Sequence, residues 1–217
     1  MDINKYIDHT LLKPTASFQE IKTLCSEALE YDFYAVCVNG CYVKTAKSLL
    51  KESHIKIAAV IGFPLGAMST AAKIAEAGFC IADGADEIDM VINIGWLKSG
   101  DIEGVEAEIS AIKKAIGNKV LKVIIETCYL SEDEKRASCL AAVNAKADFV
   151  KTSTGFGTAG ATPEDIKLMK EIVENKLQIK ASGGIKDKNT ALNYINMGVS
   201  RLGTSSGIAL VTSKKEN

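Results

Sequence analysis

The sequence predicts an α/β protein, a single (β/α)8 TIM barrel that spans residues 1–217 as one domain. Short β-rich runs alternate with helix-like segments from one end of the chain to the other, an order typical of a parallel sheet with helices between its strands. Eight such runs fit into 217 residues, a length near the minimum for this barrel. A doubly wound open sheet with fewer strands is the alternative.

The expected strands are short runs rich in β-branched and other apolar residues. They are Ile7–Thr10, Ala35–Asn39, Ile55–Gly62, Glu87–Asn93, Leu121–Thr127, Phe149–Thr152, Gln178–Ala181 and Ser200–Gly203.

Recognisable start signals precede the expected helices. Ser17–Glu20 and Ser131–Glu134 have the spacing of capping boxes. In Thr162–Asp165 a capping hydroxyl stands before a proline, with acids close to the positive end of the helix. Glycines stand near the expected helix ends, although the first of them is also compatible with a helix interior: Gly78, Gly117 and Gly198. We expect residues 214–217 to form a solvated tail.

Composition and charge exclude several classes of function. The chain is 47% apolar and 24% charged with a formal net charge of −1, an ordinary globular composition. It carries no basic stripe, so nucleic acid is not an expected partner. The N-terminus lacks a secretory signal, and the apolar runs are too short for a membrane span, so we expect a cytoplasmic protein and no membrane partner. No C-x-x-C pair occurs among the six cysteines, which we expect to be buried thiols without metal or disulfide.

Residues 155–160 read GFGTAG, which matches the G-x-G-x-x-G pattern of some dinucleotide sites. In such a site the helix opens within the glycines and an acid ends the next strand. Here the helix signal at Thr162 comes after the last glycine, and the next strand carries Lys180 instead of an acid. The pattern therefore predicts a glycine-rich loop that lets the backbone approach a ligand.

Three ionisable residues interrupt the apolar pattern of three strands. Side chains alternate across a strand, and Asp89, Lys151 and Lys180 each lie opposite the apolar face of their strand. If the apolar faces turn outward to the helices, all three point into the barrel. Two ammonium groups and a carboxylate inside one small barrel are costly to desolvate, so the set indicates a site.

Carbonyl chemistry through an imine needs this combination. A lysine is a nucleophile only when neutral, and its ordinary pKa of about 10.4 leaves almost none neutral at pH 7. Burial and a second cation both disfavour the charged form, and an aspartate can then carry protons. The pattern indicates a Schiff-base enzyme.

Two further loops predict a phosphate site. Ser182–Ile185 follows the seventh strand, and Gly203–Gly207 follows the eighth and opens a short apolar helix. In such barrels these loops frequently bind a phosphate through backbone amides, and Ser205 and Ser206 add hydroxyl donors.

The chain resembles the deoxyribose-phosphate aldolase family of class I aldolases along nearly its whole length. The segment Lys151–Gly155, which reads KTSTG, and the later KASGG of Lys180–Gly184 are highly specific as a set. Further matching stretches are Ile7–Pro14, Glu87–Asn93, Lys122–Thr127, Phe149–Gly155, Lys180–Ile185 and Arg201–Ser206.

This resemblance implies cleavage of 2-deoxy-D-ribose 5-phosphate to D-glyceraldehyde 3-phosphate and acetaldehyde without a cofactor, as a step of deoxyribose phosphate and nucleoside catabolism. It implies that Lys151 forms the Schiff base, that Lys180 lowers the pKa of Lys151 and relays protons, and that Asp89 donates and accepts protons. Asp8 is expected to hold the relay lysine. The substrate and phosphate segments contain Thr154, Gly155, Gly183, Gly184, Ser205 and Ser206. A homodimer is also expected.

The chain departs from some relatives at two places. Phe156 stands where some relatives carry a basic residue, and the chain ends in Lys215–Asn217 without the terminal tyrosine of others. Two other classes of function remain open: an isomerase or synthase that uses Asp89 as its base, and a sugar-phosphate sensor without turnover.

Overall fold

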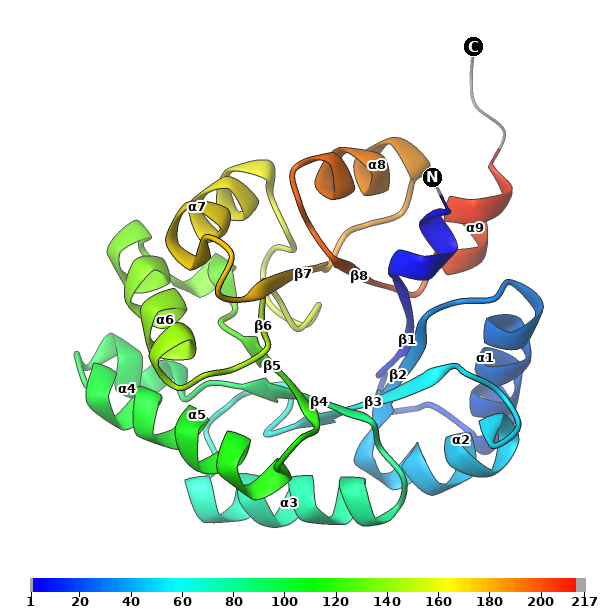
Figure 1. Cartoon of the computed structure of the whole chain (residues 1–217), viewed down its shortest axis with the longest axis horizontal. Coiled ribbons are helices and arrows are strands. Elements are labelled where there is room, and N and C mark those ends of the chain that lie inside the picture. The colour runs from blue at the N-terminus through cyan, green and yellow to red at the C-terminus, as the bar shows by residue number, and fades with distance from the viewer. Residues whose placement is uncertain (1, 214–217) are drawn as a thin grey trace.

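Eight parallel strands close into a barrel in the order β1 to β8, with β8 paired to β1. The computed structural model describes residues 2–213, and Figure 1 shows the strands as an inner ring. The strands are β1 (Ile7–Leu11), β2 (Ala35–Asn39), β3 (Lys56–Ile61), β4 (Glu87–Val91), β5 (Val120–Ile124), β6 (Phe149–Lys151), β7 (Gln178–Ser182) and β8 (Arg201–Thr204). The predicted barrel is confirmed, and the open sheet is wrong.

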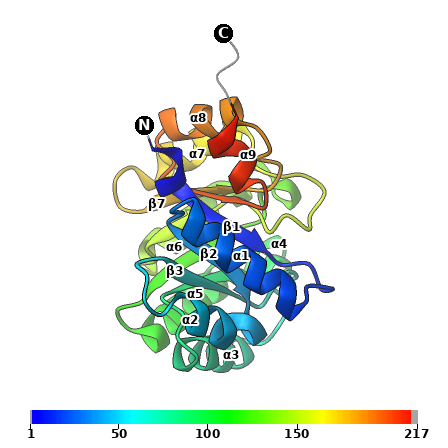
Figure 2. The same cartoon turned by 90° about the vertical axis from the view of Figure 1, so that its right-hand side faces the viewer.

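Helices cover the outside of this ring (Figure 1). They are α1 (Phe18–Glu30), α2 (Val43–Leu50), α3 (Thr70–Ala82), α4 (Ile94–Lys98), α5 (Ile102–Ile116), α6 (Glu132–Asn144), α7 (Pro163–Val173), α8 (Lys188–Asn196) and α9 (Gly207–Thr212), with short 3-10 turns η1 (Ile3–Tyr6), η2 (Gly40–Tyr42) and η3 (Thr127–Tyr129). Figure 2 shows η1 close to α9, with α3 on the opposite side of the molecule. No helix in residues 2–213 is long and apolar enough to cross a membrane.

Local signals fixed the starts of several helices. Both predicted capping boxes are present, at Ser17–Glu20 and at Ser131–Glu134. Thr162 caps α7 by accepting a hydrogen bond from the amide of Asp165. Gly78 lies inside α3. The predicted solvated tail, residues 214–217, lies outside the described residues.

Two predicted strands extend two or three residues beyond the observed ones at their C-terminal ends. Beyond β4, the side chain of Asn93 accepts a hydrogen bond from the amide of Trp96 and caps α4. Beyond β5, Glu126 adopts a left-handed backbone conformation with φ 55°. Both chain segments leave the sheet to form the loops that surround the mouth of the barrel.

Apolar side chains pack in two places. The main core lies between the strands and the helices and includes Ile88 and Met90 of β4. A small second cluster contains Leu12, Cys37, Ala58 and Val60. Because Ala58 and Val60 share the inward face of β3, this cluster makes part of the barrel interior apolar.

Four of the six cysteines are buried as predicted, whereas Cys41 is exposed and Cys128 is half-buried. The expectation of buried thiols is therefore wrong for these two, which lie in the 3-10 turns η2 and η3 at the surface of the molecule.

Candidate active site

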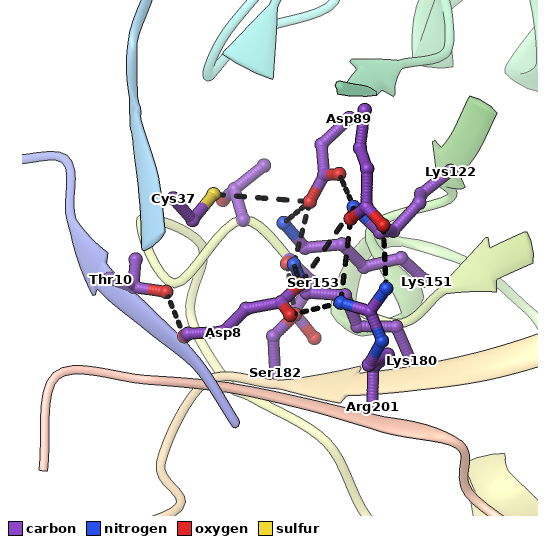
Figure 3. Close-up of polar contacts among 12 residues, drawn as sticks. Asp8, Thr10, Cys37, Asp89, Lys122, Lys151, Ser153, Lys180, Ser182 and Arg201 are labelled. Carbon is purple, nitrogen blue, oxygen red and sulfur yellow. Dashed lines mark hydrogen bonds and ion pairs between the residues drawn. The ribbon is translucent and has the colours of Figure 1, made fainter. Parts of the chain in front are cut away.

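The inward faces of the strands bring the predicted ionisable residues together (Figure 3). Asp89 lies on β4, Lys151 on β6 and Lys180 on β7, and Lys151 and Lys180 are register partners on adjacent strands. All three side chains are almost completely buried. The prediction that the three point into the barrel is confirmed.

The Asp89 carboxylate forms the centre of the cluster. Its Oδ2 accepts hydrogen bonds from Lys151 Nζ and Lys180 Nζ, each at 2.8 Å. Its Oδ1 accepts one from Lys122 Nζ at 2.6 Å. Asp89 therefore touches three buried lysines at once.

A second layer of charges lies beside this centre. Asp8 on β1 accepts hydrogen bonds from Lys180 and from Arg201. Arg201 also donates to Glu87 at 2.6 Å, and Lys122 lies 2.6 Å from another oxygen of Glu87. Asp8 thus holds Lys180, as expected from the resemblance. The Arg201 guanidinium also stacks on the Tyr34 ring at 3.3 Å.

Lys122, Arg201 and Glu87 were not predicted as members of the site. The rule of alternating faces that singled out Lys151 also applies to Lys122, which lies between Leu121 and Val123 on β5. Arg201 begins β8, where the strand signal was short. Applying the same rule to every strand would have found them.

The cluster holds one more base than acid. Among the residues named so far, the bases Lys122, Lys151, Lys180 and Arg201 face the acids Asp8, Glu87 and Asp89. With four bases against three carboxylates, full ionisation would leave one buried positive charge without a counter-ion. A neutral lysine removes that cost.

Among the three lysines of the cluster, only Lys151 has a lowered pKa. Burial lowers its pKa, and the Lys180 cation acts in the same direction, whereas Asp89 opposes both. The pKa values of Lys180 and Lys122 are instead raised, because their carboxylate partners outweigh the effect of burial. Asp89 is also buried, yet its three lysine partners hold its pKa well below 3.8.

A cavity of about 330 Å³ opens above the cluster, and Lys151 lines it. The six residues predicted to bind substrate and phosphate line the same cavity: Thr154, Gly155, Gly183, Gly184, Ser205 and Ser206. The structure therefore brings these six residues and Lys151 into one pocket at the C-terminal ends of the strands, where barrels of this kind place their active sites.

Several of the residues that line this cavity have free backbone amides. Within residues 2–213, the amides of Gly183, Gly184 and Ser205 donate to no protein acceptor. Gly183 and Gly184 have φ values of 84° and 77°, a left-handed conformation that glycine adopts without strain. The amide of Ser206 already donates to Thr204 Oγ1 at 2.9 Å. Three free amides suit an anion.

The glycines of residues 155–160 allow close packing between loops. A Cβ on Gly157 would lie 2.7 Å from Cys128 Sγ, and one on Gly160 would lie 2.2 Å from the Gly183 carbonyl oxygen. The helix α7 begins after the last glycine, at Pro163. This arrangement lacks the helix placement of a dinucleotide fingerprint, and the close approaches at Gly157 and Gly160 are between loops of the protein.

Phe156 lines the cavity where some relatives carry a basic residue. Its ring meets the Phe63 ring edge to face, with the ring centroids 5.3 Å apart. The aromatic pair therefore makes one rim of the cavity apolar. Within the described part of the chain, no group of three or more His, Cys, Asp or Glu side chains is arranged to hold a metal ion.

Comparison with known proteins agrees with this geometry. The chain is 56% identical over 211 residues to a deoxyribose-phosphate aldolase of Finegoldia magna. The alignment covers 97% of this chain and 99% of that protein. The solved structure of QR15, an aldolase, has a TM-score of 0.94 at 42% identity and covers 97% of this chain and 95% of that one. A tetrameric deoxyribose phosphate aldolase from Aeropyrum pernix has a TM-score of 0.90 at 31% identity, and the match covers 99% of this chain and 91% of that one.

The family model described as DeoC/LacD family aldolase matches residues 3–210, which include every strand and the whole lysine cluster. The buried lysines on β6 and β7, the carboxylate between them and the free amides above them therefore belong to a member of the DeoC/LacD family of aldolases.

Proposed function

We propose that this protein reversibly cleaves 2-deoxy-D-ribose 5-phosphate to D-glyceraldehyde 3-phosphate and acetaldehyde through a Schiff base on Lys151. The observation that carries the proposal is the contrast among the three buried lysines. Lys151 alone combines a lowered pKa with a place on the cavity wall. Lys122 and Lys180 are held as ammonium groups by raised pKa values.

The first step joins the sugar to the protein. The neutral Nζ of Lys151 attacks C1 of the open-chain sugar, and loss of water from the resulting carbinolamine leaves a protonated imine. The Lys180 ammonium, 2.8 Å from the Asp89 carboxylate that Lys151 also contacts, stabilises the neutral amine before attack.

The second step breaks the C2–C3 bond. The bonding electrons move to the imine and form an enamine, while the C3 hydroxyl loses its proton and becomes the aldehyde of D-glyceraldehyde 3-phosphate. Asp89, directly or through a water, accepts that proton and passes it on with Lys180. Protonation of the enamine at C2 and hydrolysis then release acetaldehyde and restore Lys151.

Phosphate binding positions the substrate. The free amides of Gly183, Gly184 and Ser205 and the hydroxyls of Ser205 and Ser206 belong to residues that line the same cavity as Lys151, and we assign the phosphate to them. Anchoring the phosphate there holds C1 against the amine, which converts a loose encounter into an oriented one. Phe156 supplies no positive charge, so the amides carry more of the binding.

Asp89 is poorly suited to the alternative role of general base in an isomerase. Its lysine neighbours hold its pKa well below 3.8, and so weak a base removes a proton from carbon more slowly than from a hydroxyl whose C–C bond breaks towards a cationic imine. The imine route avoids this step because the cationic imine accepts the electrons. We retain the single domain, the cytoplasmic location and the homodimer as predictions.

Borohydride trapping tests the proposal. Incubation with acetaldehyde and borohydride should reduce the imine to a stable secondary amine, which mass spectrometry should locate on Lys151. Lys151→Met should abolish both the adduct and cleavage while preserving the fold, because Asp89 keeps Lys122 and Lys180 as partners. An adduct on Lys180 would overturn the assignment, and no adduct at all would refute the imine mechanism.

A further inference from the structure

Glu126 is a buried acid that the proposed mechanism does not use. It lies two residues after the end of β5 and is 2% exposed. Within residues 2–213, no Lys, Arg or His forms an ion pair with its carboxylate. A buried carboxylate without a cation is costly. Its backbone is left-handed, with φ 55° and ψ 66°, which is uncommon for a residue other than glycine. Two costs at one residue beside a site point to a role there.

The carboxylate holds the loop that follows the nucleophile. Its two oxygens lie 3.1 Å and 3.3 Å from the amide of Thr154, and Oε2 also accepts a hydrogen bond from Thr154 Oγ1. Cys128 Sγ lies 3.9 Å from Oε1. Thr154 stands three residues after Lys151 and lines the cavity. Glu126 therefore acts on the cavity wall through Thr154.

These contacts determine the hydrogen-bonding role of the Thr154 hydroxyl. A threonine hydroxyl has one proton to donate and two lone pairs that accept. The Thr154 hydroxyl donates its proton to Glu126 Oε2. The amide of Phe156 donates to Thr154 Oγ1 at 3.0 Å and occupies one lone pair. One lone pair remains for a ligand in the cavity.

We propose that Glu126 is a positioning residue that makes Thr154 a hydrogen-bond acceptor for the C4 hydroxyl of the sugar. This inference rests on the proposed function. With C1 on Lys151, the C3 hydroxyl belongs beside Asp89, where its proton leaves, and the phosphate on C5 belongs at the glycine and serine amides. Thr154 lines the same cavity as Lys151 and the glycine and serine residues, so we assign the remaining hydroxyl to it. The site thereby favours an acceptor aldehyde with a hydroxyl next to its carbonyl.

The test uses the synthetic direction with acetaldehyde and two acceptors. One is D-glyceraldehyde 3-phosphate, and the other is 3-oxopropyl phosphate, which keeps the aldehyde and the phosphate but lacks the hydroxyl. The wild-type protein should prefer the first by about tenfold or more in kcat/KM, the value of roughly one hydrogen bond. Glu126→Gln should lower kcat/KM for D-glyceraldehyde 3-phosphate by about tenfold and leave kcat/KM for the second acceptor nearly unchanged. The side-chain NH2 of Gln can donate to Thr154 Oγ1, so the Thr154 hydroxyl proton is free to point into the cavity and the hydroxyl no longer acts only as an acceptor there.

Three further variants show whether Glu126 acts through Thr154. Thr154→Val should lose the preference, Thr154→Ser should retain it, and Glu126→Gln combined with Thr154→Val should be no worse than Thr154→Val alone. Glu108→Gln is the matched control: this buried acid pairs with Lys73 at 2.8 Å between α3 and α5, so its loss should lower stability and leave the preference intact. If Glu126→Gln does not fold, the Thr154 pair still decides the question.

Two kinds of result would overturn the inference. Equal losses for both acceptors in Glu126→Gln, or additive losses in the double variant, would show that Glu126 only supports the fold. A wild-type preference that survives in Thr154→Val would remove Thr154 from the role. A wild-type protein that forms no borohydride adduct would instead refute the proposed function, and this inference with it.

Discussion

Lys151 and Lys180 are chemically identical side chains 2.8 Å from the same Asp89 oxygen, yet their pKa values shift in opposite directions. The difference comes from the second partner: Asp8 also binds Lys180. Burial penalises both ammonium groups, but only Lys180 has two carboxylates to compensate for it. The additional carboxylate of Asp8 therefore explains why the pKa of Lys180 is raised while the pKa of Lys151 is lowered.

Replacing Lys180 should move the pH profile of the enzyme. The Lys180 cation lowers the pKa of Lys151, so Lys180→Leu should raise that pKa and leave fewer neutral amines at neutral pH. We expect low kcat at pH 7 that recovers as the pH rises. Lys180→Arg keeps the charge but releases no proton at accessible pH, and should lose most activity. Full activity of Lys180→Arg would reduce Lys180 to an electrostatic neighbour.

Ser206 tests the position of the phosphate. Its side chain lines the cavity beside the free amides, so Ser206→Asp places a negative charge against the phosphate dianion. We expect a steep rise in KM for 2-deoxy-D-ribose 5-phosphate and a much smaller rise for 2-deoxy-D-ribose, measured by aldehyde release. Ser206→Asn, similar in size and uncharged, is the control. Equal losses with both sugars would place the phosphate elsewhere.

At the scale of elements, the loops after β6 and β7 depend on each other. The amide of Ala161 donates to the Ser182 carbonyl oxygen at 3.0 Å, and Gly160 lies against Gly183. The loop that carries Thr154 and Phe156 therefore supports the loop that carries the free amides of Gly183 and Gly184. Gly160 is needed for this contact, because a Cβ at this position would overlap the Gly183 carbonyl oxygen.

Gly160→Ala should separate these loops. Its Cβ would lie 2.2 Å from the Gly183 carbonyl oxygen, a distance that forces the backbone to move. We expect a higher KM for the sugar phosphate, a borohydride adduct still on Lys151, and a lower free energy of unfolding. Gly78→Ala is the matched control: its Cβ meets no atom within 4 Å on α3, so it should stabilise the protein by about 0.5–1 kcal/mol. An unchanged KM in Gly160→Ala would show that the loops move independently.

For the whole molecule, the interior of the barrel couples stability to pH. Asp8 and Asp89 come from strands on different sides of the ring and both have pKa values below 3.8, because cations from β5 to β8 surround them despite burial. Since a depressed pKa in the folded state stabilises the fold above the unfolded pKa, this stabilisation is lost as the pH falls.

Acid should therefore unfold the protein by protonating the interior carboxylates. We expect the free energy of unfolding, measured by urea titration, to be constant near neutral pH and to fall by several kcal/mol below about pH 5. Protonation would leave Lys122, Lys180 and Arg201 buried without counter-ions. A stability that stays flat down to pH 3 would contradict this electrostatic account of the barrel.

The sequence by itself determined the order of strands and helices and the direction of most interior side chains. Alternation in β4, β6 and β7 placed Asp89, Lys151 and Lys180 on inward faces, and hydroxyl caps such as Thr162 marked the helix starts. These features were predictable because they depend on neighbours a few residues away: the period of a strand and the unpaired amides of a first helical turn.

Only the tertiary structure decided which lysine is neutral, which amides are free and why the glycines are needed. Lys180 meets Asp8 across 172 positions of the chain, and Arg201 meets it across 193. Desolvation and Coulomb energies depend on distances between such remote groups, whereas a sequence pattern specifies only which way each side chain points. The buried acid Glu126 shows the same limit, because its partner Thr154 lies on the next strand's loop and comes within reach only when the barrel closes.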